Sequence, residues 1–327
     1  MHYLFINGRF PQYSQTFVHD QIKAVKTQGA RKVSVFARSL TPFRFENSTP
    51  ECKQELLYGK PKNLKLAGRL CLGALRNPLL AVKIVRLIRS KKLDQLTGFL
   101  ALQLSEKPDV AVTHFGSNYE MAVQLQRYVF PQMKNVIVFH GHDISSYICK
   151  NGWDNYQQAA PNIDCAICVN KIWAFQLTQN TAIRDVKTIY LGTEIRPLRR
   201  RTNGDANTFS ILFVGRFVEK KGFEVLYKAI KSIVARGGHP IRVHCIGDGP
   251  EFGAAAQKSL SEGLGDTFIF YGSRQKNFVQ QMMDECDLLV VPSRTAQDGD
   301  SEGLPVVLLE AMAAGIPIVS TYHSGIP

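Results

Sequence analysis

The chain has 327 residues, of which 45% are hydrophobic and 20% charged, a composition typical of a folded globular protein with room for two domains. It contains no run of about 20 apolar residues, so no membrane-spanning helix is expected. The formal net charge of +13 excludes a neutral surface and fits nucleic acid, anionic lipid or phosphorylated substrates.

Residues 1–8 lack a basic leader and a long apolar region, which predicts a first β-strand and no signal peptide. Further short apolar runs, rich in β-branched residues, alternate with helical segments along the chain. The predicted strands are Lys32–Ala37, Val110–Thr113, Asn135–Phe139, Cys165–Val169, Ser210–Val214, Arg242–Ile246, Phe268–Tyr271, Leu288–Val291 and Ile316–Ser320. This alternation predicts an α/β protein with parallel sheets covered by helices on both faces.

There are more strands than one such sheet usually holds, so we expect two doubly wound domains. The polar, basic stretch 195–207 is the predicted linker between residues 1–194 and 208–327. Open α/β sheets bind ligands at the carboxyl ends of their strands, which favours a ligand in a cleft between the domains. The last strand is followed by a few residues and no helix, so the second domain is expected to be incomplete.

Positive charge is concentrated between residues 60 and 92, with ten Lys or Arg residues and no acid. Many leucine, isoleucine and valine residues are mixed with these cations in the stretch 64–89. Two interpretations stay open: helices lying on an anionic membrane surface, or a solvated basic face of ordinary surface helices. No zinc-finger spacing or aromatic-basic signature is present, so nucleic acid is not an expected partner.

Seven cysteines without regular spacing argue against a secreted disulfide framework and favour a reducing cytoplasm. Cys165 and Cys168 are the one close pair. A zinc site would need further ligands at matched spacing, and none follows, so both are expected in a buried strand.

Two histidine clusters follow predicted strands of the first domain, His114-Phe115-Gly116-Ser117 and His140-Gly141-His142-Asp143. Both strand ends are expected to face the cleft. His140 and His142 could suggest a metal, but further ligands would be required, and no metal site is predicted.

In the second domain the strand 209–214 leads into Gly215-Arg216 and, after a short loop, Lys221-Gly222. Glycines allow a ligand to approach the backbone, and a helix beginning after Gly222 offers unpaired N–H groups. Arg216 and Lys221 would suit a diphosphate, although cations in a strand–helix turn can also simply face water. The turn 247–253 suggests a dinucleotide fingerprint, but its third glycine is one residue late and no acidic residue ends the next strand.

The strand 287–291 leads through a polar loop to Glu302-Gly303-Leu304-Pro305 and an apolar helix, 306–314. Pro305 fits the first turn of that helix and Gly315 its end. Glu310 lies inside the helix, where a carboxylate needs a partner; sugar hydroxyls or a salt bridge could supply one.

These segments together resemble the family-four retaining glycosyltransferases of the GT-B architecture. The two glutamates are separated by seven residues, as that family's signature requires, and the similarity spans residues 209–327. The segments 10–18, 140–145 and 298–303 further resemble the exopolysaccharide branch with its colanic-acid-type enzymes. The resemblance implies two Rossmann-like domains facing across a cleft.

The resemblance also implies a role for each motif residue. Arg216 and Lys221 would hold the nucleotide diphosphate, Glu310 the ribose hydroxyls, and Glu302 the donor sugar. Backbone N–H groups of Gly303 and Leu304 would lie near the phosphates, and no metal or other cofactor would be needed.

On the acceptor side, His140 would lie beside the donor sugar and the acceptor, with Asp143 as an orienting partner. Ser14 and Thr16 would border the acceptor. The implied function is transfer of a hexosyl unit from a nucleotide sugar to a lipid-linked saccharide at the inner face of the cell membrane. The expected donor is a UDP-sugar. The alternatives are a phosphorylase or epimerase on the same fold, a catalytically impaired fragment, or a non-catalytic homologue that still binds nucleotide sugar.

Overall fold

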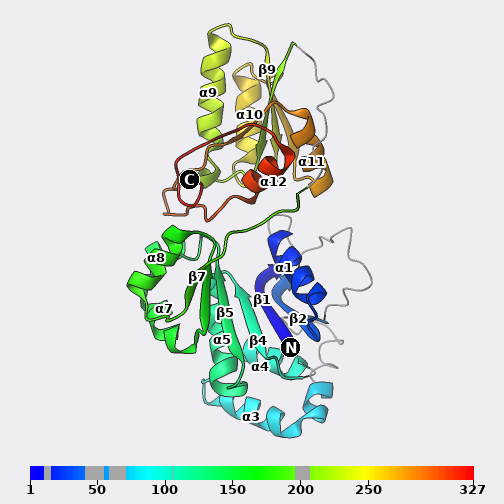
Figure 1. Cartoon of the computed structure of the whole chain (residues 1–327), viewed down its shortest axis with the longest axis vertical. Helices are drawn as coiled ribbons and strands as arrows, with labels where there is room; N and C mark the ends of the chain where they lie inside the picture. Colours follow the sequence, from blue (N-terminus) through cyan, green and yellow to red (C-terminus); the bar gives the residue numbers. More distant parts are fainter. Residues whose placement is uncertain (11–15, 41–54, 59–70, 105, 196–206) are drawn as a thin grey trace. The chain divides into compact units, whose positions relative to one another are not determined.

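The computed structural model describes residues 1–10, 16–40, 55–58, 71–104, 106–195 and 207–327. The chain divides into two compact units, Met1–Ile189 and Tyr190–Pro327 (Figure 1). The division lies close to the predicted domain end at residue 194, and the predicted linker falls mostly outside the described residues. Every described helix is too short or too polar to cross a bilayer.

The first unit is built on a seven-stranded sheet with the order β3-β2-β1-β4-β5-β6-β7, and all its neighbouring strands are parallel. The strands are β1 (His2–Phe10), β2 (Lys32–Leu40), β3 (Glu55–Tyr58), β4 (Val110–His114), β5 (Lys134–Phe139), β6 (Cys165–Cys168) and β7 (Val186–Thr188). The helices are α1 (Thr16–Thr27), α3 (Pro78–Arg89), α4 (Gln95–Gln103), α5 (Tyr119–Gln124), α6 (Ser146–Asn151), α7 (Asp154–Ala159) and α8 (Lys171–Asn180). Three of these helices begin at a side chain that accepts a backbone N–H, namely Asn77, Asp94 and Asn170.

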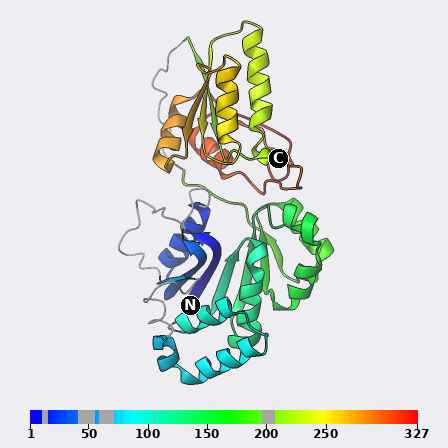
Figure 2. The ribbon, with the colours of Figure 1, turned by 180° about the vertical axis from the view of Figure 1, so that it is seen from behind.

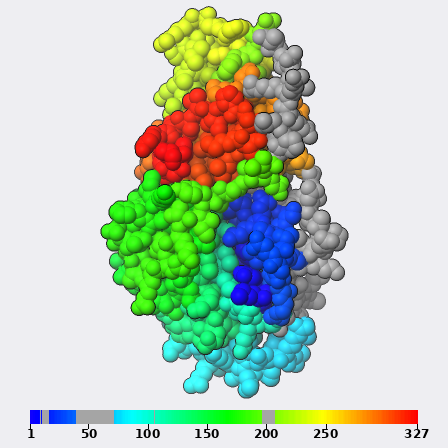
Figure 3. Space-filling model, viewed as in Figure 1, coloured from blue at the N-terminus to red at the C-terminus, as the bar shows by residue number. Residues whose placement is uncertain are grey.

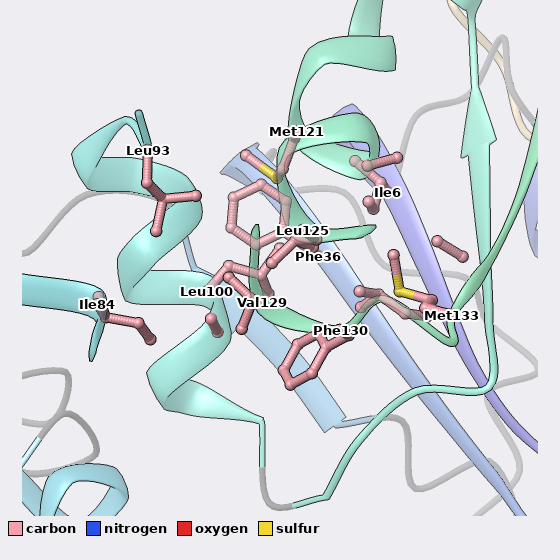
Figure 4. Close-up of a cluster of buried hydrophobic side chains, with 14 residues drawn as sticks. Ile6, Phe36, Ile84, Leu93, Leu100, Met121, Leu125, Val129, Phe130 and Met133 are labelled. Carbon is pink, nitrogen blue, oxygen red and sulfur yellow. The ribbon is translucent and has the colours of Figure 1, made fainter. Parts of the chain in front are cut away.

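Alternate residues of each strand are buried on opposite faces of this sheet. Leu4 and Ile6 of β1 lie in a cluster with side chains from α3, α4 and α5, including Ile84, Leu100 and Met121 (Figure 4). Phe5, between them, packs on the other face with Val18 and Ile22 of α1. The sheet is therefore covered on both faces, as parallel sheets require.

The second unit contains a five-stranded parallel sheet with the order β10-β9-β8-β11-β12. The strands are β8 (Phe209–Val214), β9 (Ile241–Ile246), β10 (Phe268–Gly272), β11 (Leu288–Val291) and β12 (Ile318–Ser320). The helices are α9 (Phe223–Ala235), α10 (Phe252–Ser261), α11 (Lys276–Glu285) and α12 (Val306–Ala314). Helices α9 and α10 pack on one face and α11 and α12 on the other (Figures 1 and 2).

The nine strands predicted after the first one and the α/β class are confirmed, with differences of a few residues at strand ends. Cys165 and Cys168 lie in β6 with free thiols, and burial raises the pKa of both. Strands β3 and β7 were not predicted, because β3 contains no β-branched residue and a lysine interrupts β7. Pro305 stands at the N-cap of α12, one position before the predicted first turn, and Gly315 ends the helix at φ 68°.

The strand order positions the candidate sites. In the first sheet β1, β4 and β5 are neighbours, and in the second β8, β11 and β12 are neighbours. In each sheet the order reverses beside the first strand of the unit, at β1 and at β8. The loops that follow these strands meet at one edge of each sheet, the place where open α/β sheets bind ligands.

Candidate functional site

In the second unit, the loop after β8 lies directly against the end of β11. Gly222 adopts φ 68°, and a Cβ added there would lie 1.8 Å from the carbonyl oxygen of Pro292. A glycine is therefore required both by the backbone conformation and by the close approach. The turn Glu219–Lys221 is held beside the loop 292–305 as a result.

Lys221 and Glu302, which the sequence assigned to separate parts of a donor, form an ion pair with Nζ 3.0 Å from Oε1. The side chains are 18% and 9% exposed. Burial alone would raise the pKa of Glu302, but the charges of Lys221 and Lys220 outweigh it and hold that pKa below its ordinary value. Glu302 is therefore an ionised, enclosed carboxylate next to the lysine predicted to bind phosphate.

The other predicted donor-site residues are near Lys221 or Glu302 in the sequence. Arg216 is exposed and makes no ion pair with any residue that the structure describes. Gly303 is buried and Leu304 half-buried, in the segment that leads into α12. Glu310 is half-buried within α12, whose buried positions Val307, Leu308 and Ala311 face the sheet.

The first two glycines of the turn 247–253, the rival dinucleotide motif, pack against backbone of the neighbouring loop instead of facing a ligand. A Cβ on Gly247 would lie 1.9 Å from the carbonyl oxygen of Gly215, and one on Gly249 would lie 2.5 Å from that of Phe217. These glycines instead allow the loop after β9 to pack against the loop after β8.

Sequence reasoning did not distinguish Lys220 from Lys221, yet they have different partners. The Lys220 Nζ lies 3.0 Å from Oδ2 of Asp300 and 3.1 Å from its Oδ1. Glu219 binds the Arg294 guanidinium and accepts the Gln297 N–H at 2.9 Å. The acidic residues of the polar loop are visible in the sequence as possible partners for lysine, but which lysine each one pairs with depends on the loop conformation.

In the first unit, the structure joins the two predicted histidine clusters. Because β4 and β5 are neighbours, Nδ1 of His114 and Nε2 of His140 lie 3.0 Å apart, with ring centroids separated by 5.2 Å. The rings of Phe17 and Phe115 lie 4.6 and 4.8 Å from that of His140. Burial lowers the pKa of His114 to about 3, and burial and then the neighbouring His114 hold the pKa of His140 well below its ordinary value. Both imidazoles are neutral near pH 7.

Asp143 is fully buried, and its carboxylate accepts three backbone N–H groups. The donors are Gly116 at 2.7 Å, Gly141 at 2.8 Å and His140 at 3.0 Å. Asp143 thus orients the backbone of His140, while the imidazole is oriented by His114. Its enclosed position supports holding the two loops together rather than touching an acceptor.

The remaining predicted residues contribute little to the geometry. Ser14 lies outside the described residues, and Thr16 begins α1 with a side chain that lies outside them as well. His142 bonds Ser146 rather than joining His140. Among the described residues, no three His, Cys, Asp or Glu side chains gather as a metal site would require.

Known proteins share both the sequence and the fold. The family model for glycosyl transferases group 1 matches residues 194–327. The putative colanic acid biosynthesis glycosyltransferase WcaL of Salmonella typhimurium is 30% identical over 98% of this chain and 82% of its own length. WcaL of Escherichia coli is 34% identical over 68% of this chain, and the amylovoran biosynthesis glycosyltransferase AmsK of Erwinia amylovora is 31% identical over 67%. These two matches span about half the length of those relatives, 55% and 54%.

Solved structures agree on the architecture. Anabaena HepE in complex with UDP-glucose superposes with a TM-score of 0.69 at 19% identity, over 99% of this chain and 81% of that one. WaaG, a glycosyltransferase involved in lipopolysaccharide biosynthesis, gives 0.63 at 15% identity, over 99% and 82%. The chain therefore belongs to the group 1 glycosyltransferases, a family of transferase enzymes, and has their GT-B fold.

Proposed function

We propose that this protein is a retaining glycosyltransferase that moves a hexosyl unit from a UDP-sugar to a lipid-linked oligosaccharide or polysaccharide acceptor. The observation that carries this is the enclosed Lys221–Glu302 pair at the carboxyl ends of β8 and β11, with exposed Arg216 nearby in the chain. Relatives named for colanic acid and amylovoran biosynthesis support a role in exopolysaccharide biosynthesis.

Each residue then has a chemical task. Lys221 and Arg216 stabilise negative charge on the departing nucleoside diphosphate, where fixed cations act most strongly in the transition state. They supply the charge that a metal ion would otherwise bring. Glu302 accepts hydrogen bonds from the donor sugar and Glu310 from the ribose, while N–H groups at Gly303 and Leu304 approach the phosphates.

His140 is the proposed first-unit contact with the transferred sugar and the acceptor. Its Nε2 lies against His114, so its Nδ1, which has no partner among the described residues, is the nitrogen proposed to bond a sugar hydroxyl, and the neutral ring adds no charge. Ser14 and Thr16 are proposed to border the acceptor, and Asp143 to hold the His140 loop in place.

Calorimetric titration with UDP, GDP and ADP tests donor binding. We expect UDP to bind, and Lys221→Ala and Glu310→Ala each to weaken binding at least about tenfold, roughly 1.4 kcal/mol. Lys228→Ala, which removes an exposed lysine of α9, is the matched control. Equal binding by all four proteins would refute the site; UDP binding without release of UDP from UDP-glucose in the presence of acceptor would favour a non-catalytic homologue.

Membrane attachment is proposed for the basic segment 60–92, of which residues 71–92 lie in the described structure. On α3 one side is buried around Ile84, whereas Leu79 is 84% and Val82 69% exposed. Lys83 and Arg86 share that exposed side. The segment that contains α3 lies at the surface (Figure 3, cyan). Exposed apolar side chains among cations suit the inner, anionic face of a cell membrane.

Sedimentation with vesicles tests this attachment. We expect binding to anionic phosphatidylglycerol vesicles at low salt and little binding to phosphatidylcholine vesicles, because the cations attract charged headgroups. Lys83→Ala with Arg86→Ala should reduce binding, whereas Lys23→Ala with Lys228→Ala, which removes the same charge elsewhere, should not. Equal binding to both lipids would contradict the proposal.

A further inference from the structure

Three consecutive residues of the turn after β8 reach three different partners on the loop 292–305, and each contact joins opposite charges. The contacts are Glu219 with Arg294, Lys220 with Asp300, and Lys221 with Glu302. The two loops are thus linked by three ion pairs in a row, of which only the last involves residues that the proposed function uses.

The central contact is the one best placed to control Glu302. Lys220 holds both oxygens of Asp300 and also lies 3.4 Å from the carbonyl oxygen of Ser301, the residue before Glu302. The Lys220 and Asp300 side chains are only 16% and 23% exposed. An ion pair this enclosed is weakly screened, unlike an exposed pair such as Lys228 with Glu224.

The first contact fixes the other end of the loop. One oxygen of Glu219 binds Arg294 and the other accepts the Gln297 N–H, while the Lys220 carbonyl oxygen accepts the Arg294 N–H at 2.9 Å. The segment 294–297 is therefore tied to the turn through side chain and backbone. Between this tie and Glu302, Lys220 provides the next attachment.

Donor binding would change the last contact. Lys221 now neutralises Glu302, and a diphosphate would compete for the same ammonium group. A loop that depended on Lys221 alone would be released as Lys221 turned to the phosphates. Glu302 would then lose its position when its carboxylate is needed by the sugar.

We propose that Lys220 and Asp300 are positioning residues, which keep Glu302 in place when Lys221 transfers its charge to the diphosphate of the donor. This inference rests on the proposed function. It assigns the two adjacent lysines different tasks: Lys221 binds the donor, and Lys220 holds the loop that presents Glu302.

A donor-free experiment tests the loop directly, because Lys221→Met imitates a lysine that has left Glu302. Amide hydrogen exchange is followed over residues 298–304 in the wild type, Lys221→Met, Asp300→Asn and the double variant. We expect exchange to change less than about twofold in Lys221→Met and to rise more than about tenfold in the double variant. Opening of the loop by Lys221→Met alone, or no opening in the double variant, would overturn the proposal.

A second arm measures the consequence for the sugar, using UDP and UDP-glucose as probes. In Asp300→Asn we expect the affinity for UDP to stay within about twofold, while that for UDP-glucose falls about fivefold, because Glu302 serves only the sugar. Equal weakening of both probes would indicate general support of the loop and overturn a positioning role. Glu224→Gln, which breaks an exposed pair of the same type, is the control.

The two arms separate the possible failures. A wild type that binds neither probe would contradict the proposed function, while the exchange experiment would still decide whether Lys220 and Asp300 hold the loop. Lys220→Arg, which keeps a cation opposite Asp300, should behave like the wild type in both arms.

Discussion

The two candidate sites lie at equivalent places of two similar sheets, yet each is stabilised by a different kind of interaction. The histidine site of the first unit has two neutral imidazoles in contact with phenyl rings, and its loops are held through backbone N–H groups by the Asp143 side chain. The site of the second unit is ionic, with three charged contacts between two loops. The same strand order thus supports a site of neutral rings in one unit and a site of ion pairs in the other.

The difference predicts which conditions affect each site. Neutral histidines at low pKa make the first site sensitive to acid, because protonation in a buried place is costly. Enclosed ion pairs between fixed loops make the second site sensitive to loop geometry. Both tryptophans, Trp153 and Trp173, lie in the first unit, so their fluorescence reports its unfolding separately.

The largest expected effect is the loss of Asp143. Asp143→Ala leaves three enclosed N–H groups without their acceptor, and we expect the free energy of unfolding of the first unit to fall by about 4 kcal/mol. Urea titration followed by tryptophan fluorescence measures this. Asp154→Ala, at an exposed helix start, should cost under about 1 kcal/mol. UDP binding should survive this substitution. Its loss together with the stability of the first unit would show that the site of the second unit depends on the first.

Acid should act next, and on the histidine site. The folded protein keeps His114 and His140 neutral, while the unfolded chain protonates them below about pH 6.5. Stability that is complete above that pH is therefore lost as the pH falls toward about 3, the pKa of His114. When the pH is lowered from 7.5 to 5.5, the two histidines together should reduce the free energy of unfolding of the first unit by about 2.5 kcal/mol.

The same fluorescence titration at the two pH values checks this loss. His114→Phe keeps an aromatic ring against Phe5 but removes one titrating group, so it should show about half the loss. An equal loss in variant and wild type would assign the acid sensitivity to other groups.

A smaller effect is expected from the glycine that brings the two loops of the ionic site together. Gly222 and Gly237 have nearly the same φ, 68° and 69°, but a Cβ at Gly237 meets nothing within 4 Å. Gly222→Ala should cost about 2 kcal/mol more than Gly237→Ala, since only the first forces the Pro292 backbone to move.

Circular dichroism during thermal unfolding, compared with tryptophan fluorescence, measures the loss in the second unit. Gly222→Ala should also weaken UDP binding in calorimetry, while Gly237→Ala should not. Similar losses in both variants would show that backbone conformation, rather than the approach of the loops, limits this position.

The sequence predicted the fold well because apolar, β-branched runs mark buried parallel strands. It also placed Glu302, Glu310, Arg216 and Lys221 in the second unit through a motif with fixed spacing. What it could not give was pairing across the sheet. His114 lies next to His140 because β4 pairs with β5. The order of strands in a sheet cannot be read from the hydrophobic pattern of the sequence.

The same limit applied to the charged loops and to Asp143. Lys220 and Lys221 are identical neighbours, and only the fold separates their partners. Asp143 was expected to be an orienting partner of His140, and the groups that it binds are backbone N–H groups, which carry no sequence signal. Hydrogen bonds to the main chain depend on loop conformation and therefore escape pattern-based prediction.

The adjacent lysines also have an evolutionary consequence. Deleting either codon would leave the same Glu-Lys-Gly segment, so an alignment cannot tell which lysine a relative has lost. The contact of Gly222 with Pro292 decides it: the lysine beside the glycine must occupy the place of Lys221. Relatives with a single lysine should then lack the partner of Asp300. The residues at positions 220 and 300 should therefore change together in evolution.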